Sequence, residues 1–122
     1  MAEQSQRRIS RPAAADLSAK QYFFVKSSNG KAALPSADGG LVLGVLQNDP
    51  QADDGATICD GGRTQVVSNG TVEIDKPVAA ANGGKAKEAA SGEYVQGIAL
   101  TGDGGVDGAI IEIHYNPQGR LA

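Results

Sequence analysis

The sequence predicts a mainly β fold, a small pseudo-duplicated β-barrel or sandwich with an extended N-terminal arm. Glycine accounts for 17 of the 122 residues, about twice the usual share. The pairs Asn29-Gly30 and Asn69-Gly70 separate apolar runs, and Asn-Gly between such runs is the strongest local signal for a β-hairpin. No segment after residue 20 repeats its apolar residues with the period of a helix.

The first twenty residues differ in composition from the rest of the chain. They contain no glycine and no strand-like apolar run, so residues 1–20 are expected to form an extended arm and residues 21–122 the body. Fully extended, the arm would reach about 65 Å, farther than a body of this size needs for its own packing. It is therefore expected to be disordered or to lie over a neighbouring molecule.

Charge divides at the same boundary. The arm holds four basic side chains, among them Arg7, Arg8 and Arg11, and two acidic ones, whereas the other 102 residues hold seven basic and twelve acidic. An acidic body repels a phosphate backbone, so we expect no nucleic-acid partner. The three arginines of the arm could themselves contact nucleic acid or an acidic protein surface, of which we expect the protein surface, unless they only keep the arm solvated.

Apolar runs between the turns predict the strands of the body. In the last of these runs, Ile111, Ile113 and Tyr115 share one face and Glu112 and His114 the other. The expected strands are Gln21–Lys26, Lys31–Leu34, Leu41–Gln47, Ala56–Cys59, Thr64–Val67, Thr71–Ile74, Lys85–Glu88, Tyr94–Leu100 and Ala109–Tyr115.

Two of these strands supply further candidate contacts. The run Leu41–Leu46 is apolar on both faces, which predicts that the body covers one face and a loop or another subunit the other. Leu41 and Leu43 are therefore candidate contact residues. Side-chain alternation places Tyr22 and Phe24 on one face of the first strand, and this face either joins the core or anchors a contact between subunits.

The two halves of the body resemble each other. Three short matches occur at a spacing of 53 or 54 residues, and the order of turns, apolar strands and acidic loops is the same in both halves. The alternative is chance similarity among Gly- and Ala-rich stretches. The matches are Gly30-Lys31-Ala32 with Gly84-Lys85-Ala86, Gly44-Val45-Leu46 with Gly97-Ile98-Ala99, and Gly55–Ile58 with Gly108–Ile111.

Catalytic and metal-binding side chains are scarce. The acidic loops 48–55 and 102–108 place carboxylates beside glycines, as calcium loops do, but their spacing does not fit an EF-hand. His114 is the single histidine and Cys59 the single cysteine, too few for a zinc site or a disulfide. We expect no enzyme, cofactor or metal, and no apolar run is long enough to cross a membrane.

The order of motifs resembles that of the capsid cement, or decoration, proteins of tailed bacteriophages. The resemblance covers residues 14–120 and is most distinctive at Gly44–Pro50, after the Tyr22-Phe23-Phe24-Val25-Lys26 strand and the Asn29-Gly30-Lys31 turn. It continues through Gly61–Val67 and Gly92–Leu100. The Arg7-Arg8 segment is not part of this resemblance.

The resemblance implies a structural virion protein. Such a protein binds the outer face of the major capsid protein lattice and stabilises the expanded shell, and it self-associates, as a homotrimer or else as a dimer. It would be made in the cytoplasm of the host bacterium and end on the capsid surface. The alternative is a glycan- or calcium-binding module on the virion that uses the acidic loops.

Overall fold

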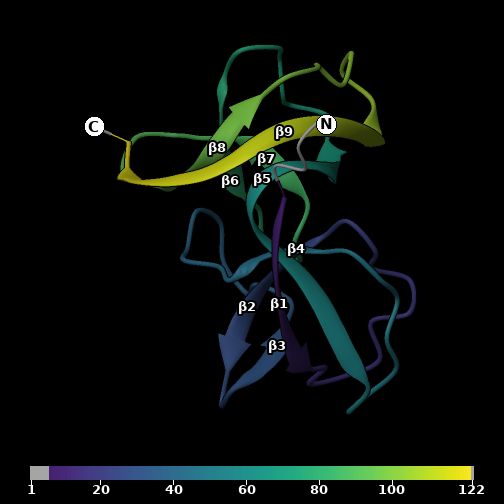
Figure 1. The fold of residues 1–122 in the computed structure, drawn as a ribbon. Coiled ribbons are helices and arrows are strands. Elements are labelled where there is room, and N and C mark those ends of the chain that lie inside the picture. Colours follow the sequence, from purple (N-terminus) through teal and green to yellow (C-terminus); the bar gives the residue numbers. More distant parts are fainter. Residues whose placement is uncertain (1–5, 122) are drawn as a thin grey trace.

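The computed structural model describes residues 6–121, which form nine strands joined by turns (Figure 1). This confirms the expected mainly β class. No helix long and apolar enough to cross a membrane is present in the described residues. The strands are β1 Arg7–Pro12, β2 Phe24–Ser28, β3 Lys31–Ala33, β4 Gly44–Leu46, β5 Gly55–Asn69, β6 Pro77–Ala80, β7 Ala86–Glu88, β8 Tyr94–Ala99 and β9 Asp107–Arg120.

The strands form two lobes that share the long strand β5 (Figure 1). In the first lobe, β3, β2, β4 and β5 are neighbours in that order, and β1 pairs with residues 55–61 of β5. In the second lobe, β7, β6, β8 and β9 are neighbours, and β9 pairs with residues 62–69 of β5. Parallel bridges, Ala13 to Ala32 and Ser68 to Ala86, close the two rings. We call these five-stranded rings barrel 1 and barrel 2.

The strand register confirms the internal repeat. Strands β2 and β4 of barrel 1 pair in the same register as β6 and β8 of barrel 2, 53 residues later in the chain. The corresponding pairs are Phe24↔Val45 with Pro77↔Ile98, and Val25↔Gly44 with Val78↔Gly97.

Details outside the strands repeat as well. Tyr22 and Asp75 both have a positive φ, 69° and 67°, and their amides donate to the carbonyl oxygens of Leu46 and Ala99. At the far end of each barrel the same ion pair recurs, with 2.9 Å between the lysine Nζ and the aspartate Oδ1 in both copies. These pairs are Lys31–Asp53 and Lys85–Asp107.

One of the three sequence matches is displaced from the structural alignment. Leu46 pairs with Ile58 and Ala99 with Ile113, so the equivalent of Ile58 is Ile113, not Ile111. The register of β9 against β5 shifts between Val67 and Asn69. This irregularity accommodates the additional residues at the start of β9.

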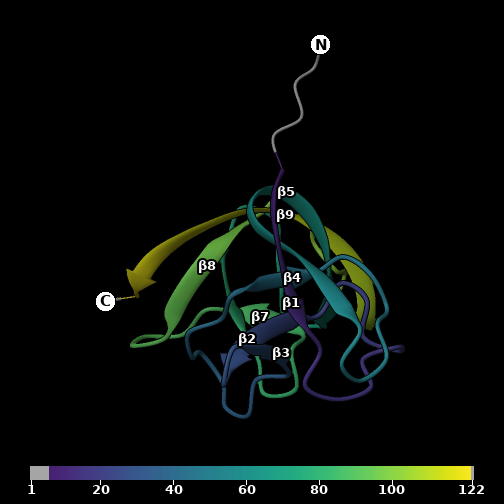
Figure 2. The same ribbon diagram turned by 60° about the horizontal axis from the view of Figure 1, so that its bottom comes forward.

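The expectation that no strand precedes residue 21 is wrong. Strand β1 pairs with β5 of its own chain (Figure 1 and Figure 2), and Ala13 and Leu17 are buried in barrel 1. Barrel 2 is closed by residues 62–69, which are the second half of β5, whereas barrel 1 must take the equivalent strand from the N-terminal segment. Residues 1–5 of the expected arm lie outside the described residues.

Other strand boundaries also differ from expectation. The expected strands Ala56–Cys59 and Thr64–Val67 are one strand, β5, which includes residues 60–62 between them. The strand is not interrupted there, because its partner changes from β1 to β9 between residues 61 and 62. Residues 71–74 form no strand, Pro77–Ala80 forms an unexpected one, and the run Leu41–Gln47 is reduced to β4.

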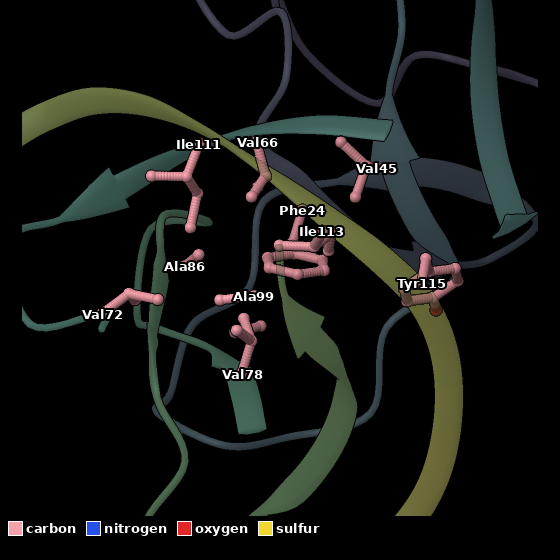
Figure 3. Close-up of a cluster of buried hydrophobic side chains, with 11 residues drawn as sticks. Phe24, Val45, Val66, Val72, Val78, Ala86, Ala99, Ile111, Ile113 and Tyr115 are labelled. Atoms are coloured by element: carbon pink, nitrogen blue, oxygen red, sulfur yellow. The ribbon is translucent and has the colours of Figure 1, made fainter. Parts of the chain in front are cut away.

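Each barrel has its own core. Successive side chains of a strand point to opposite faces, so Val25 and Leu46 fill barrel 1 while Phe24 and Val45 point into barrel 2. Figure 3 shows the Phe24 ring among the side chains of barrel 2. The barrel 1 core comprises Ala13, Leu17, Val25, Ala32, Leu46, Ala56 and Ile58, and the barrel 2 core comprises Phe24, Val45, Val66, Val72, Val78, Ala80, Ala86, Ala99, Ile111, Ile113 and Tyr115.

Candidate functional site

The three predicted arginines lie on β1, whose side chains are exposed except for half-buried Ile9. Arg7 makes an ion pair with Asp60, 3.2 Å from Nε to Oδ1, and Arg8 donates from Nε to the side chain of Gln6. Among the described residues the ladder partner of β1 is β5, and the other edge of β1 meets β3 only at the Ala13–Ala32 bridge that follows the strand. The structure therefore presents the arginines along an open strand edge.

The two aromatic candidates do not share a face. Phe24 is fully buried in the barrel 2 core, with its ring centroid 6.3 Å from that of Tyr115. This corrects the expectation that Phe24 contacts a partner, because no surface of its side chain is available. Tyr22 is half-buried and lies before β2 in a left-handed conformation, so strand alternation does not extend to it.

The two leucine candidates also separate. Leu41 is 68% exposed, in a segment that belongs to no strand. Leu43 is half-buried and packs against the barrel 1 core, and its amide donates to the carbonyl of Val25. Of the candidate apolar contacts, Leu41 is the one whose side chain is free to meet another molecule.

Three of the five carboxylates of the acidic loops are engaged within the chain. Asp103 is 7% exposed and accepts hydrogen bonds from the Ser68 hydroxyl and from the amides of Val72 and Gly105. Asp53 and Asp107 form the repeated ion pairs with lysines. Residues 6–121 contain no group of three or more histidine, cysteine or acidic side chains placed to hold a metal ion.

The hydrogen bonds to Asp103 change its acidity. Burial alone raises the pKa of this carboxyl, but the bonds from Ser68, Val72, Gly105 and Gly70 outweigh burial, so the net pKa lies below its ordinary value. A carboxyl with a lowered pKa in the folded state stabilises the fold above its unfolded pKa, about 3.9, and loses this contribution as the pH falls through the folded pKa. Asp103 thus ties the 102–108 loop to the end of β5 at neutral pH.

We predict that Asp103→Asn lowers the free energy of unfolding by about 2 to 3 kcal/mol at pH 7, because hydrogen bonds to a buried charge are lost. Urea unfolding followed by circular dichroism between pH 7 and pH 3 measures the effect. The wild type should lose stability below about pH 4, and the variant should show a smaller loss over this range. The exposed Asp75→Asn is the control, and equal effects of the two substitutions would contradict the prediction.

The single histidine and single cysteine do not form a catalytic pair. Burial raises the pKa of the Cys59 thiol, whose Sγ donates to the carbonyl of Gly61 at 3.3 Å. His114 is exposed on the outer face of β9 and borders a cleft of about 250 Å³ with Arg7 and Asp60. A buried thiol with a raised pKa is a poor nucleophile.

Barrel 2 carries exposed apolar side chains, not expected from the sequence, at the end that holds the Lys85–Asp107 ion pair. Ile74, Val106 and Ile110 are 56%, 58% and 56% exposed. Ile74 lines a hollow of about 600 Å³ together with residues 70–73 and 102–105. Val106 follows this lining directly, and Ile110 pairs with Val67 near the start of β9. Ile74 and Ile110 lie within expected strands, where an apolar side chain is interpreted as part of the core.

The whole fold is similar to that of a bacteriophage protein whose structure has been solved. That structure is the crystal structure of the head fiber gp8.5 N base in bacteriophage phi29, with a TM-score of 0.71. The similarity covers 96% of this chain and 98% of the other, at 12% sequence identity. No protein-family model matches the sequence, and no characterised protein matches it. The likeness establishes a shared fold, a pair of small β-barrels in tandem.

Proposed function

We propose that this protein is a structural component of a bacteriophage virion. It decorates the head, binding the outer face of the major capsid protein lattice and stabilising the expanded shell. The observation that carries the proposal is the structural likeness to the phi29 head fiber base, which extends over nearly the full length of both chains. The order of motifs that resembles cement proteins points to the same class of protein.

The surface chemistry fits a role based on contact. Arg7, Arg8 and Arg11 stand on an open strand edge and Leu41 is exposed, and these residues are proposed as protein contacts. The proposed partners are the major capsid protein and further copies of this chain, as a homotrimer. Several copies linked together would bind a lattice more tightly than one copy through their high effective concentration.

No observation favours the calcium-binding alternative. A calcium loop needs several free carboxylate or carbonyl oxygens directed at one point. Asp103 instead accepts three hydrogen bonds inside its loop, and Asp53 and Asp107 are paired with lysines. These carboxylates hold the loops of the two barrels in place.

Binding to heads tests the proposal. Purified protein is mixed with expanded heads that were assembled without it, and the heads are sedimented. We expect it to co-sediment with expanded heads and to raise the temperature at which they release their DNA. Unexpanded heads are the control for lattice specificity. Absence from the pellet of expanded heads would overturn the proposal.

A further inference from the structure

The internal repeat provides a control for every surface position, because one barrel shows which side chains the fold accepts at the equivalent place in the other. Tyr22 and Asp75 share their backbone conformation and their hydrogen bond, which makes the residues before them, Gln21 and Ile74, equivalent. Gln21 is exposed. The fold therefore does not require an apolar side chain at this position.

The other two exposed aliphatic residues of barrel 2 show the same difference. The repeated ion pairs align Asp53 with Asp107, so Val106 corresponds to Ala52. The parallel bridges align Ala13 with Ser68. The pairing of Pro12 with Gly55 then corresponds to that of Val67 with Ile110, so Ile110 corresponds to Gly55.

We call the three exposed aliphatic residues Ile74, Val106 and Ile110 the apolar end. Barrel 1 has Gln21, Ala52 and Gly55 at the equivalent positions.

The apolar end is bordered by negative charge. Residues 70–76 and 102–108 hold four carboxylates and one lysine, but Asp103 is buried and Asp107 is paired with Lys85. Glu73 and Asp75 flank Ile74 directly, and both are exposed. A partner that covers the apolar end therefore needs basic side chains around its contact.

Barrel 1 also differs from barrel 2, because the arginines of its strand β1 lack the neighbours that the equivalent positions of barrel 2 have. Arg8 pairs with Cys59 and Arg63 with His114 in equivalent registers. In barrel 2, Arg63 makes an ion pair with Glu112 at 2.8 Å.

The counterpart of Glu112 in barrel 1 is Thr57, which cannot neutralise Arg8. Arg11 is exposed where barrel 2 has the buried Val66. No ion pair within residues 6–121 engages Arg8 or Arg11. Barrel 1 therefore carries two arginines with no carboxylate partner in the part of the chain that the structure describes.

These two surfaces cannot meet within one molecule. Arg8 lies opposite Cys59 of β5 and Ile110 lies opposite Val67. Eight residues of β5 separate the two positions, a path of up to about 26 Å. A contact between the surfaces must therefore join two copies of the chain.

We infer that the apolar end of one copy binds β1 of a second copy, head to tail. The three aliphatic side chains pack on the exposed strand and on the aliphatic parts of its arginines. Glu73 and Asp75 then face the guanidinium groups of Arg8 and Arg11. Two different surfaces meet in such a heterologous contact, which closes into a ring or continues as a chain of copies.

Sedimentation velocity of the purified chain over a range of concentrations tests this contact, and it needs no capsid. We expect reversible association that weakens with added salt. Ile74→Gln, which installs the residue of barrel 1, should weaken association about tenfold, the loss expected for one aliphatic contact. Ile98→Gln is the control, because it removes an exposed apolar side chain outside the apolar end and should leave association unchanged.

A charge exchange identifies the partner surface. Arg8→Glu with Arg11→Glu should weaken association about tenfold or more, as should Glu73→Arg with Asp75→Arg. A mixture of the two double variants should associate again, since their surfaces are complementary. A chain that stays monomeric, or association that responds to Ile74→Gln but not to the arginine reversal, would overturn the inference. The second result would show that apolar ends bind one another.

Because this experiment uses the purified chain alone, its outcome is separate from that of head binding. A protein that binds heads without self-association would keep the proposed function and lose this contact. One that self-associates without binding heads would do the reverse.

Discussion

Replacing Gly97 with alanine is expected to prevent barrel 2 from closing. A Cβ at this position would lie 2.1 Å from the carbonyl oxygen of His114 and 3.1 Å from the Cα of Tyr115. Both neighbours are backbone atoms of β9, so β8 and β9 would have to separate. We expect the free energy of unfolding to fall by more than about 4 kcal/mol, a large part of the total stability of a small protein.

The repeat makes the same prediction for barrel 1. A Cβ at Gly44 would lie 2.0 Å from the carbonyl oxygen of Cys59, so Gly44→Ala should separate β4 from β5. Glycine is thus required at two equivalent positions, because at each of them a backbone carbonyl oxygen of the neighbouring strand leaves no room for a Cβ.

Urea unfolding followed by circular dichroism measures both effects. Gly40→Ala is the matched control, because nothing lies within 4 Å of its Cβ position and its backbone is not left-handed. It should change stability by less than about 0.5 kcal/mol. If Gly97→Ala unfolds at the same urea concentration as Gly40→Ala, the close approach of β8 to β9 does not limit the fold.

Local patterns were sufficient to predict the hairpin at Asn29-Gly30 and the repeat. The hairpin expected at Asn69-Gly70 does not form, because residues 71–74 belong to no strand. Asn29 and Gly30 have φ angles of 51° and 80°, as the expected hairpin turn between β2 and β3 requires. Ile111, Ile113 and Tyr115 are buried as their alternation predicts. These features depend on residues close together in the chain, and that information is present in a single sequence.

Features that depend on distant pairing were not predictable in the same way. The stretch Asp60-Gly61-Gly62 has the composition of a turn, yet it remains within strand β5 because β1 and β9 pair on either side of it. Strand β1 has no apolar alternation, since all of its residues but Ile9 are exposed. Only the internal repeat carries a signal for β1, through its equivalence to residues 62–69.

The candidate contacts likewise divide into those that could be predicted from the sequence and those that required the structure. The exposure of the arginines follows from their charge, and sequence reasoning found them. The apolar end was missed because exposed and buried isoleucines look alike in a sequence. Ile74 becomes informative only when the structure aligns it with Gln21.

Phe24→Ala is expected to destabilise both barrels, because Phe24 belongs to a strand of barrel 1 and fills the core of barrel 2. Its side chain is fully buried, and truncation of a buried phenylalanine costs about 3 to 5 kcal/mol. The same substitution should weaken the coupling between the barrels. Differential scanning calorimetry should show one cooperative transition for the wild type and a broader or divided one for the variant.

Leu41→Ala separates the two roles that an apolar side chain can have here. Leu41 is 68% exposed, so its truncation should change the free energy of unfolding by less than about 0.5 kcal/mol. Truncation of a contact residue weakens binding to the partner and leaves the monomer stable, whereas truncation of a core residue destabilises the monomer.

If Phe24→Ala left the unfolding transition unchanged, barrel 2 would not depend on barrel 1 for its core, and Phe24 would again be a candidate contact residue.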